Sequence, residues 1–371
     1  MMYRETWAEI DLQAIQKNIQ ALKNIQASDT HIMAVVKADG YGHGAVKTAE
    51  AALDAGASHL GTALMEEAVS LREAGIRAPI VVLGRTSAKA AAYASEHNIA
   101  LTAFQPDWLA EAEQHVPTDH TLQIHVKFDS GMGRLGVRTV EELENVLHQV
   151  DQADRIAIQG LFTHLATADE LEEQYFNEQM VAFEKAVQVA KHKLGRIPYI
   201  HCANSAAAMR FPNACYNMVR FGISMYGLLP SEELCGELPF MLSPSMSLFS
   251  TLTHVKRVTK GSGISYGATF IAEEDTWIGT VPVGYGDGWV RANAKKGTVL
   301  VDGERVPIVG RICMDQFMVK LPRPIAVGSK VTLIGGDGDD AISIEEVAGR
   351  LDTITYEIPC LLNSRIPRIY T

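Results

Sequence analysis

The sequence has few cysteines and no long hydrophobic run. Its five cysteines are widely spaced and fall in no paired pattern, which argues against a disulfide framework and against a zinc site. They are Cys202, Cys215, Cys235, Cys313 and Cys360. No apolar run is long enough to cross a bilayer, and the first residues lack the apolar segment of a signal peptide. We therefore expect a cytoplasmic protein with reduced thiols, no membrane partner and no bound metal.

Basic residues are in the minority. The chain has 33 lysines and arginines against 44 aspartates and glutamates, which gives a formal net charge of -11. This balance disfavours nucleic acid or an anionic membrane surface as the main partner. Any anionic ligand must therefore be met by cations gathered locally.

What the chain does have is length and an ordinary globular composition. Its 371 residues exceed the usual size of one compact core, so two domains are expected, one of them large. Hydrophobic residues make up 47% and charged residues 21%, which excludes a disordered or fibrous chain.

Short apolar segments alternate with longer amphipathic ones from about residue 33 to residue 225. This alternation is typical of repeated βα units around a parallel sheet. Strands are predicted near residues 33–37, 59–63, 79–83, 100–104, 122–128, 157–163, 199–202 and 217–220. Eight such units favour a closed (β/α)8 TIM-type barrel over residues 1–240, with a doubly wound open sheet as the main alternative.

The pattern changes after about residue 240 to alternating, β-branched segments with turn signals. We therefore predict a mostly β C-terminal domain over residues 241–371. Residues 298–301 and 305–308 flank Asp302-Gly303 as in a hairpin, and Pro307 favours an edge strand. A further strand is predicted over 331–334, and Ser343 with Glu346 has the spacing of a helix capping box.

Lys37 stands at the end of the first predicted strand of the barrel and is followed by glycine-rich backbone. A rigidly placed, partly desolvated lysine amine can carry pyridoxal phosphate as a Schiff base. Gly40, Gly42 and Gly44 allow the backbone to approach a ligand closely, and Tyr41 offers a hydroxyl to a phosphate. The plain alternative is a strand-end lysine that reaches solvent.

Polar residues also follow several other predicted strands, and in a parallel barrel these ends form the functional face. The segments are Asp129 to Gly136 after the fifth strand, His164 after the sixth, Asn204-Ser205 after the seventh and Arg220 to Ile223 after the eighth. Ser205 and the amides of Gly222 and Ile223 suit a phosphate, although Ser205 is equally suited to cap the following alanine-rich helix. His164 has the alternative of a buried core histidine, and the arginines have that of surface ion pairs.

The segment Ala34 to Gly44 resembles the cofactor-lysine motif of alanine racemases, bacterial enzymes that depend on pyridoxal phosphate. Further segments resemble that family in the same order along the chain, at residues 7–12, 131–136, 201–206, 265–267, 284–288 and 310–316. The lysine motif alone indicates the wider class of barrel-type pyridoxal phosphate proteins. Ser265-Tyr266-Gly267 and Cys313-Met314-Asp315 indicate racemases specifically.

The resemblance implies that the chain interconverts L- and D-alanine through a pyridoxal phosphate aldimine and supplies D-alanine for peptidoglycan. It implies that Lys37 holds the cofactor and is one proton-transfer base. The second base, on the opposite face of the substrate, is Tyr266 from the partner subunit of a homodimer with shared active sites. A related serine or broad-specificity amino-acid racemase is the alternative.

The resemblance also implies the binding residues. The cofactor phosphate is assigned to Tyr41, Ser205, Tyr356 and the amides of Gly222 and Ile223, and its ring nitrogen to Arg220. His164 is assigned to link Arg220 to Tyr266, and Asn204 completes the cofactor-binding set. Arg134 is assigned to the cofactor phenolate and the substrate carboxylate, with the Met314 amide of the partner subunit as a second carboxylate donor. Lys127 matches a position that is carbamylated in some relatives.

Two further readings are disfavoured by the same residues. A decarboxylase of this barrel class is disfavoured because the Tyr266 and Met314 segments match racemases and because an arginine is assigned to the ring nitrogen. A non-catalytic pyridoxal phosphate carrier would resemble the barrel alone, and residues 241–371 argue against it.

Overall fold

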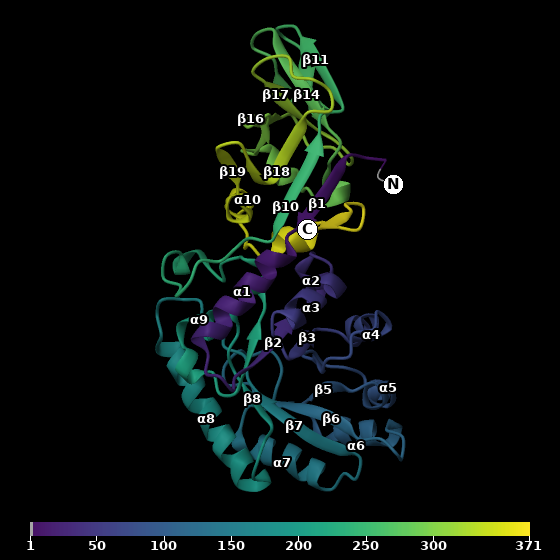
Figure 1. The fold of residues 1–371 in the computed structure, drawn as a ribbon, viewed down its shortest axis with the longest axis vertical. Helices are drawn as coiled ribbons and strands as arrows, with labels where there is room; N and C mark the ends of the chain where they lie inside the picture. Colours follow the sequence, from purple (N-terminus) through teal and green to yellow (C-terminus); the bar gives the residue numbers. More distant parts are fainter. Residues whose placement is uncertain (1–2) are drawn as a thin grey trace. The chain divides into compact units, whose positions relative to one another are not determined.

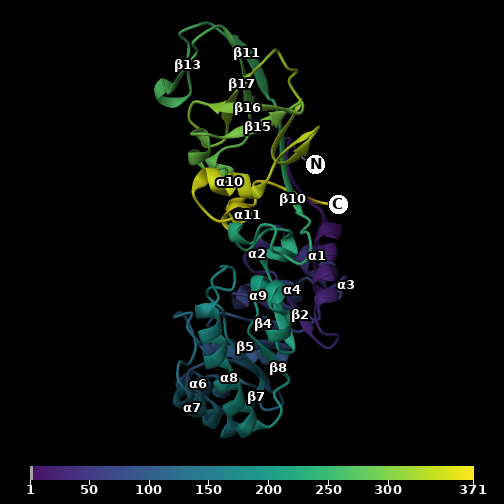
Figure 2. The same ribbon diagram turned by 90° about the vertical axis from the view of Figure 1, so that its left-hand side faces the viewer.

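The computed structural model describes residues 3–371, which form two compact units (Figures 1 and 2). The barrel unit comprises Ala14–Gly40 and Ala45–Ser243. The β unit comprises Tyr41–Gly44 and Pro244–Thr371, together with the N-terminal segment up to Gln13.

The barrel unit is built on a parallel sheet of eight strands in the order β8-β7-β6-β5-β4-β3-β2-β9. They are β2 (His31–Val35), β3 (His59–Thr62), β4 (Ile80–Val82), β5 (Ile99–Ala103), β6 (Leu122–Lys127), β7 (Ile156–Phe162), β8 (Tyr199–His201) and β9 (Met218–Phe221). β9 returns to pair with β2, and the Arg220 amide donates to the Ala203 carbonyl at 3.0 Å across the remaining seam. The sheet is thus a nearly closed TIM-type barrel, as predicted. The strand order is sequential, without the reversal of a doubly wound sheet.

Helices surround this sheet (Figures 1 and 2). They are α1 (Leu12–Ile25), α3 (Ala45–Asp54), α4 (Met65–Glu73), α5 (Ala91–Glu96), α6 (Pro106–His115), α7 (Val140–Asp151), α8 (Gln174–Leu194) and α9 (Ser205–Arg210). In α7 the buried residues Leu143, Val146, Leu147 and Val150 recur at helical spacing and form its inward face. Thr139 caps this helix by accepting the Glu142 amide at 3.1 Å.

Each of the eight predicted barrel strands is present within two residues of its predicted limits. Every residue of β3, β4, β5 and β9 is buried. Strands covered on both faces are continuously apolar, and this is why they stand out in the sequence.

The β unit contains a second sheet with the strand order β11-β14-β17-β16-β15-β18-β10-β1-β20, and β19 pairs with β18. Its strands are β1 (Thr6–Ile10), β10 (Met246–Thr251), β11 (His254–Val258), β14 (Thr276–Val281), β15 (Thr298–Val301), β16 (Glu304–Val309), β17 (Phe317–Leu321), β18 (Lys330–Asp337), β19 (Asp340–Ile342) and β20 (Arg368–Tyr370). A separate two-stranded sheet pairs β12 (Gly263–Ile264) with β13 (Phe270–Ile271), and the helices are α10 (Ile344–Leu351) and α11 (Glu357–Leu361). This unit is mostly β, as the sequence predicted.

The local signals in the β unit are confirmed with one exception. β15 and β16 form the predicted hairpin, with positive φ angles of 50° at Asp302 and 76° at Gly303. Ser343 caps α10 by accepting the Glu346 amide at 3.1 Å. The edge position predicted from Pro307 is wrong, because β16 lies between β15 and β17. Its pairing with β17 uses Ile308 and Val309, so no hydrogen bond to β17 is required of Pro307.

The N-terminus differs from the predicted division at residues 1–240 and 241–371. β1 pairs antiparallel with β10 and parallel with β20, which places the segment up to Gln13 in the β unit. The sequence shows an alternating strand there, but alternation does not specify which sheet supplies the partners. The chain passes from the barrel unit to the β unit between Ser243 and Pro244.

No helix within residues 3–371 has both the length and the apolar character needed to span a lipid bilayer.

Candidate functional site

Lys37 is the second residue after the end of β2, at the start of the segment drawn as α2 (Lys37–Tyr41), and its side chain is half-buried. This segment is a left-handed turn, because Ala38, Asp39, Gly40 and Tyr41 have φ angles between 51° and 62°. Left-handed backbone costs a non-glycine residue about 1–2 kcal/mol, so the surroundings must hold the turn in place. Lys37 is therefore followed directly by a strained backbone turn that its surroundings hold in place.

Three further cations belong to the same end of the barrel. Lys127 ends β6 and Arg220 lies in β9, and these two side chains are buried, with 5% and 4% exposure. Arg134 is exposed on the loop after β6. Burial, and then the positive charges of Arg134 and Arg220, lower the pKa of Lys127 to about 8. The lowered pKa thus reflects burial first, and the neighbouring positive charges that add to it suit an anionic ligand.

Arg220 is held by acceptors from the neighbouring strand ends. Its Nη1 donates to His201 Nδ1 at 2.8 Å, and its Nη2 donates to the Thr163 carbonyl at 2.9 Å, the Cys202 carbonyl at 2.9 Å and His164 Nδ1 at 3.1 Å. Among residues 3–371, no acceptor is bonded to its Nε. Burial lowers the pKa of Arg220 to about 10, which still leaves it protonated at neutral pH. The guanidinium is thus fixed, with one N–H group available to a ligand.

The histidines around Arg220 are neutral. Burial first and the charge of Arg220 second hold the pKa values of His164 and His201 well below their usual range. An arginine only donates, so His201 accepts at Nδ1 and carries its proton on Nε2. His201 Nε2 lies 2.8 Å from His125 Nδ1, and His125 Nε2 lies 3.3 Å from Gln159 Oε1. A hydrogen-bonded chain therefore runs from Arg220 into the barrel.

Sequence reasoning missed this chain. His125 and Gln159 lie within β6 and β7, and a polar residue inside a buried strand was the available signal.

Ser205 and Asn204 occupy the start of α9, where a phosphate site was predicted. The cap of this helix is Asn204, whose Oδ1 accepts the Ala207 amide at 3.0 Å, so the alternative in which Ser205 is the cap is wrong. Ser205 Oγ accepts the Gly222 amide at 2.9 Å, which joins α9 to the end of β9. The Gly222 amide is therefore paired with Ser205. Ile223 begins a short 3-10 turn and, as a first helical residue, has no carbonyl partner within that turn.

The loop after β6 is organised by one buried carboxylate. Asp129 accepts the amides of Gly131 at 3.1 Å, Gly133 at 2.9 Å and Arg134 at 3.0 Å. These bonds set the backbone from which the Arg134 side chain extends. Asp129 was recognised in the sequence only as part of this segment, without a role.

The remaining predicted site residues lie in the β unit. Tyr266 is at the tip of the β12–β13 hairpin and is 72% exposed, and Met314 is 54% exposed. The Ser265 hydroxyl donates to the Arg311 carbonyl at 2.6 Å, and the amide after Tyr285 donates to the Met314 carbonyl at 2.8 Å. These contacts place the hairpin and the loops at 284–288 and 310–316 side by side.

Tyr41 and Tyr356 form a second group in the β unit, with ring centroids 6.3 Å apart. The predicted residues thus divide between the two units. Lys37, Arg134, His164, Asn204, Ser205, Arg220, Gly222 and Ile223 belong to the barrel unit, and Tyr41, Tyr266, Met314 and Tyr356 belong to the β unit.

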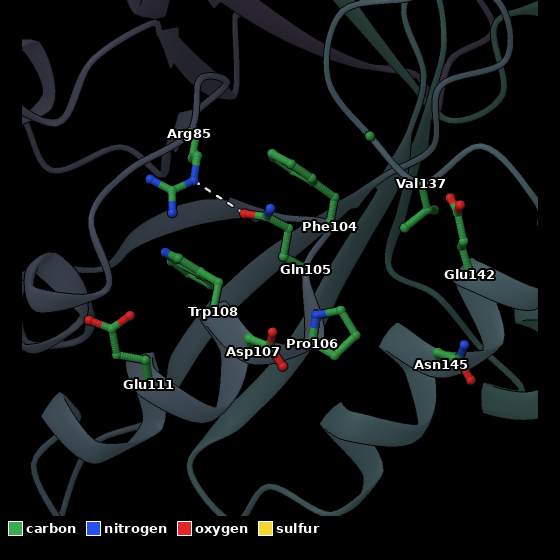
Figure 3. Close-up of a pocket in the computed structure, with 11 residues that line it drawn as sticks. Arg85, Phe104, Gln105, Pro106, Asp107, Trp108, Glu111, Val137, Glu142 and Asn145 are labelled. Carbon is green, nitrogen blue, oxygen red and sulfur yellow. Dashed lines mark hydrogen bonds between the residues drawn. The ribbon is translucent and has the colours of Figure 1, made fainter.

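A pocket of about 590 Å³ lies beside the loop after β6 (Figure 3). Its lining includes Phe104, Trp108 and Glu142, and Arg85 Nε donates to Gln105 Oε1 at 3.2 Å in its wall. Gly136, the last residue of the predicted segment after the fifth strand, lines it, whereas no residue assigned to the cofactor or the substrate does. The cations Lys37, Lys127, Arg134 and Arg220 are therefore not part of the lining of this pocket.

Comparison with known proteins gives a consistent result over the whole chain. The alanine racemase N-terminal domain model matches residues 10–230, and the alanine racemase C-terminal domain model matches residues 245–370. An alanine racemase of Geobacillus stearothermophilus is 50% identical over 368 residues, which cover 99% of this chain and 94% of that protein. Alanine racemase 1 of Bacillus subtilis is 52% identical over 369 residues, covering 99% and 93%.

Solved structures resemble the fold equally closely. The alanine racemase of Bacillus anthracis with bound L-Ala-P has a TM-score of 0.97 at 46% identity, covering 100% of this chain and 96% of that chain. A histidine racemase from Leuconostoc mesenteroides has a TM-score of 0.90 at 30% identity, covering 100% and 99%.

Proposed function

The chain belongs to the alanine racemase family. From that membership we propose the roles that its residues have in the interconversion of L- and D-alanine. Its activity is that of an amino-acid racemase acting on alanine, and relatives 50% and 52% identical over nearly the full chain do not favour the serine or broad-specificity alternative. The family depends on pyridoxal phosphate. The proposed cellular role is cytoplasmic supply of D-alanine for peptidoglycan.

The residues of the barrel unit fit this cofactor. Pyridoxal phosphate, when bound, draws electrons from the substrate α-carbon and so makes the α-proton removable. The cofactor carries a phosphate and a phenolate, and Lys127, Arg134 and Arg220 supply positive charge; after burial, the charges of the two arginines are the next causes of the lowered pKa of Lys127. Lys37 supplies the amine that holds its carbonyl carbon.

The phosphate contacts follow from the start of α9. Ser205 already accepts the Gly222 amide, so its hydroxyl proton is directed elsewhere and donates to the phosphate together with the Ile223 amide. Asn204 fixes this arrangement by capping α9 and by donating to the Leu165 carbonyl at 3.4 Å. Tyr41 and Tyr356 add two hydroxyl donors.

Arg220 would face the ring nitrogen of the cofactor and would keep its own proton, because its pKa of about 10 lies above neutral pH. The imidazoles of His164 and His201 that contact it are neutral, since their pKa values lie far below neutral pH. No acid in contact with Arg220 therefore supplies a proton to that nitrogen. With an unprotonated ring nitrogen the cofactor would be a weaker electron sink, and Arg220 would thereby favour prompt return of a proton over side reactions.

Racemisation needs a proton-transfer group on each face of the substrate α-carbon. We assign one face to Lys37 Nζ and the other to the hydroxyl of Tyr266 contributed by the partner subunit. Tyr266 stands 72% exposed at a hairpin tip, and the neighbouring Met314 is also exposed, as groups that complete another subunit's site would be. Arg134 and the Met314 amide from the partner subunit then bind the substrate carboxylate.

Lys127 is proposed to carry a carbamate. Its pKa of about 8 leaves part of the amine neutral at physiological pH, and the neutral amine adds to carbon dioxide and loses one proton. The resulting anion offsets the positive charge of Arg134 and Arg220 and offers Arg134 a hydrogen-bond acceptor.

The observation that carries the proposal is that Lys37, Lys127 and Arg220 all lie at the carboxyl ends of barrel strands, beside an ordered Arg134 loop. The direct test is turnover of L-alanine, D-alanine, L-serine, L-lysine and L-histidine by the full chain loaded with pyridoxal phosphate. We expect racemisation of alanine far above the others, and none by Lys37→Ala. Equal turnover of serine would reinstate the broad-specificity alternative.

A second measurement tests the cofactor assignment. An absorbance band at roughly 420 nm should disappear on borohydride treatment, with the cofactor then attached to the peptide containing Lys37. Attachment to another lysine would overturn the assignment.

A further inference from the structure

A glutamate side chain ties the left-handed turn after Lys37 to the neighbouring βα unit. The Ala38 amide donates to Glu67 Oε1 at 2.6 Å. The other side of the same carboxylate, Oε2, accepts the amides of Ala63 at 2.8 Å and Leu64 at 3.1 Å. One carboxylate therefore joins the backbone that follows β2 to the backbone that follows β3.

Glu67 is itself firmly placed. It lies in the first turn of α4, where a carboxylate is favoured by the unpaired amides of the helix start. The strands beneath it are in parallel register, with Val35 opposite Gly61, and the Val36 amide donates to the Gly61 carbonyl at 2.9 Å. Glu67 thus continues the pairing of β2 and β3 beyond the last hydrogen bond of the strands.

Two further hydrogen bonds at the turn are local. The Gly40 amide donates to the Val36 carbonyl at 2.9 Å, and Asp39 Oδ1 accepts the Ala45 amide at 2.8 Å. Neither involves another strand-helix unit. Because Ala38 and Asp39 are strained in this conformation, a released turn would relax toward ordinary backbone and would redirect the bond on which Lys37 stands.

We propose that Glu67 is a positioning residue for Lys37. By holding the turn, Glu67 keeps the lysine amine in line with the face of the substrate α-carbon on which Lys37 acts. The inference rests on the proposed function, in which Lys37 transfers a proton. A displacement of about 1 Å at a reacting group can cost a hundredfold in rate, so the effect falls on kcat and leaves substrate binding nearly unchanged. Glu67 does not touch the reacting atoms.

The test compares Glu67→Ala and Glu67→Gln with the matched control Glu66→Gln, whose side chain is exposed on the same helix turn. Glutamine has one acceptor oxygen, so it serves either Ala38 or the Ala63 and Leu64 amides, but not both. We expect kcat for alanine to fall roughly 10-fold to 100-fold in Glu67→Ala and less in Glu67→Gln, with KM changed less than about threefold. Glu66→Gln should match the wild type.

Isotope effects separate positioning from a loss of folded enzyme. With α-deuterated L- and D-alanine, Glu67→Ala should raise the primary isotope effect in the direction in which Lys37 removes the proton and leave the other direction unchanged. The isotope effect is a ratio in which the amount of active enzyme cancels. Reduced kcat with unchanged isotope effects in both directions would show a merely structural role and overturn the inference.

Hydrogen exchange supplies a readout that does not depend on catalysis. The amides of residues 38–40 should exchange faster in Glu67→Ala than in Glu66→Gln. Faster exchange with unaltered kcat and isotope effects would mean that the tether does not matter to Lys37, and unaltered exchange would mean that there is no tether. Failure of the wild type to racemise alanine, or full activity in Lys37→Ala, would instead refute the proposed function.

Discussion

Among single residues, Lys127 shows most directly what burying a charged amine costs the stability of the fold. Its pKa in the folded protein is about 8 against an ordinary 10.5, chiefly because it is buried. Between these two values the folded chain binds fewer protons at this site than the unfolded chain, so the free energy of unfolding rises with pH across that window. Below about pH 8 the lysine is charged in both states and the whole penalty is present.

Lys127→Met should therefore increase the free energy of unfolding by up to about 3 kcal/mol below pH 8, and this gain should shrink as the pH rises toward 10.5. Urea denaturation from pH 7 to pH 10.5 in buffers free of carbon dioxide measures it. Lys185→Met, at an exposed position of α8, is the control and should show no such trend. A gain that does not depend on pH would contradict the lowered pKa.

Arg220 differs from Lys127 because hydrogen bonds offset the cost of burying its charge. Arg220→Lys has one ammonium group in place of a planar fork and cannot serve His201, His164 and the carbonyls of Thr163 and Cys202 together. We expect a loss of about 1–3 kcal/mol in the free energy of unfolding from the unsatisfied buried acceptors. Denaturation of the cofactor-free chain measures this, and unchanged stability would show that lysine repairs the network.

Among helices and strands, the β12–β13 hairpin depends on one glycine outside it. Gly310 has a φ of 71°, and a Cβ there would lie 2.7 Å from Ser265 Cβ and 2.8 Å from the Ile264 carbonyl oxygen. Gly310→Ala must therefore push the hairpin away and move Tyr266. Gly328, with a φ of 91° and nothing within 4 Å of an added Cβ, offers the same backbone strain without the clash.

We expect Gly310→Ala to lose at least about tenfold in kcat, whereas Gly328→Ala should lose only about 1 kcal/mol of stability. Racemisation rates measured beside thermal unfolding compare the two variants. Equal activity in both would mean that the position of Tyr266 does not limit the reaction.

Elements defined by their own residues could be predicted, and elements defined by distant partners could not. The barrel strands and the turn at Asp302-Gly303 carry their signals locally, as continuous apolar runs and a dipeptide tolerant of positive φ. The partners of β1 and the interior place of Pro307 depend on strands far away in the sequence.

The same division holds in the site. Lys37, Ser205 and Arg220 stand out because they follow apolar strands, and the family resemblance supplied their proposed roles. The cap of α9 is Asn204 and not Ser205. The sequence could not distinguish the two, because asparagine and serine are nearly equivalent as helix caps. The links from Arg220 to Gln159 and from Glu67 to Ala38 join separate strand-helix units, so spacing within the chain gives no sign of them.

For the molecule as a whole, the proposed site needs two copies of the chain. Lys37→Ala and Tyr266→Phe should each be nearly inactive alone. In a heterodimer of the two, one site contains both substitutions and the other contains neither, so unfolding and refolding an equal mixture should restore about one quarter of the wild-type activity.

Activity of the mixture against protein concentration, with sedimentation in parallel, measures this restoration. Each variant refolded by itself is the control. No restoration in a mixture that contains dimers would mean that Lys37 and Tyr266 act within one chain. Full activity of a true monomer would remove the need for a dimer.

The place of β1 between β10 and β20 sets an order of events during synthesis. The ribosome makes β1 before any residue of the barrel unit, yet its two neighbours begin at Met246 and Arg368. The barrel unit, residues 14–40 and 45–243, is thus available to fold before β1 has either partner, and the second sheet is completed only when β20 has emerged. Chains that stall before Arg368 leave one side of β1 uncovered, and such chains present an unpaired edge to quality-control proteases.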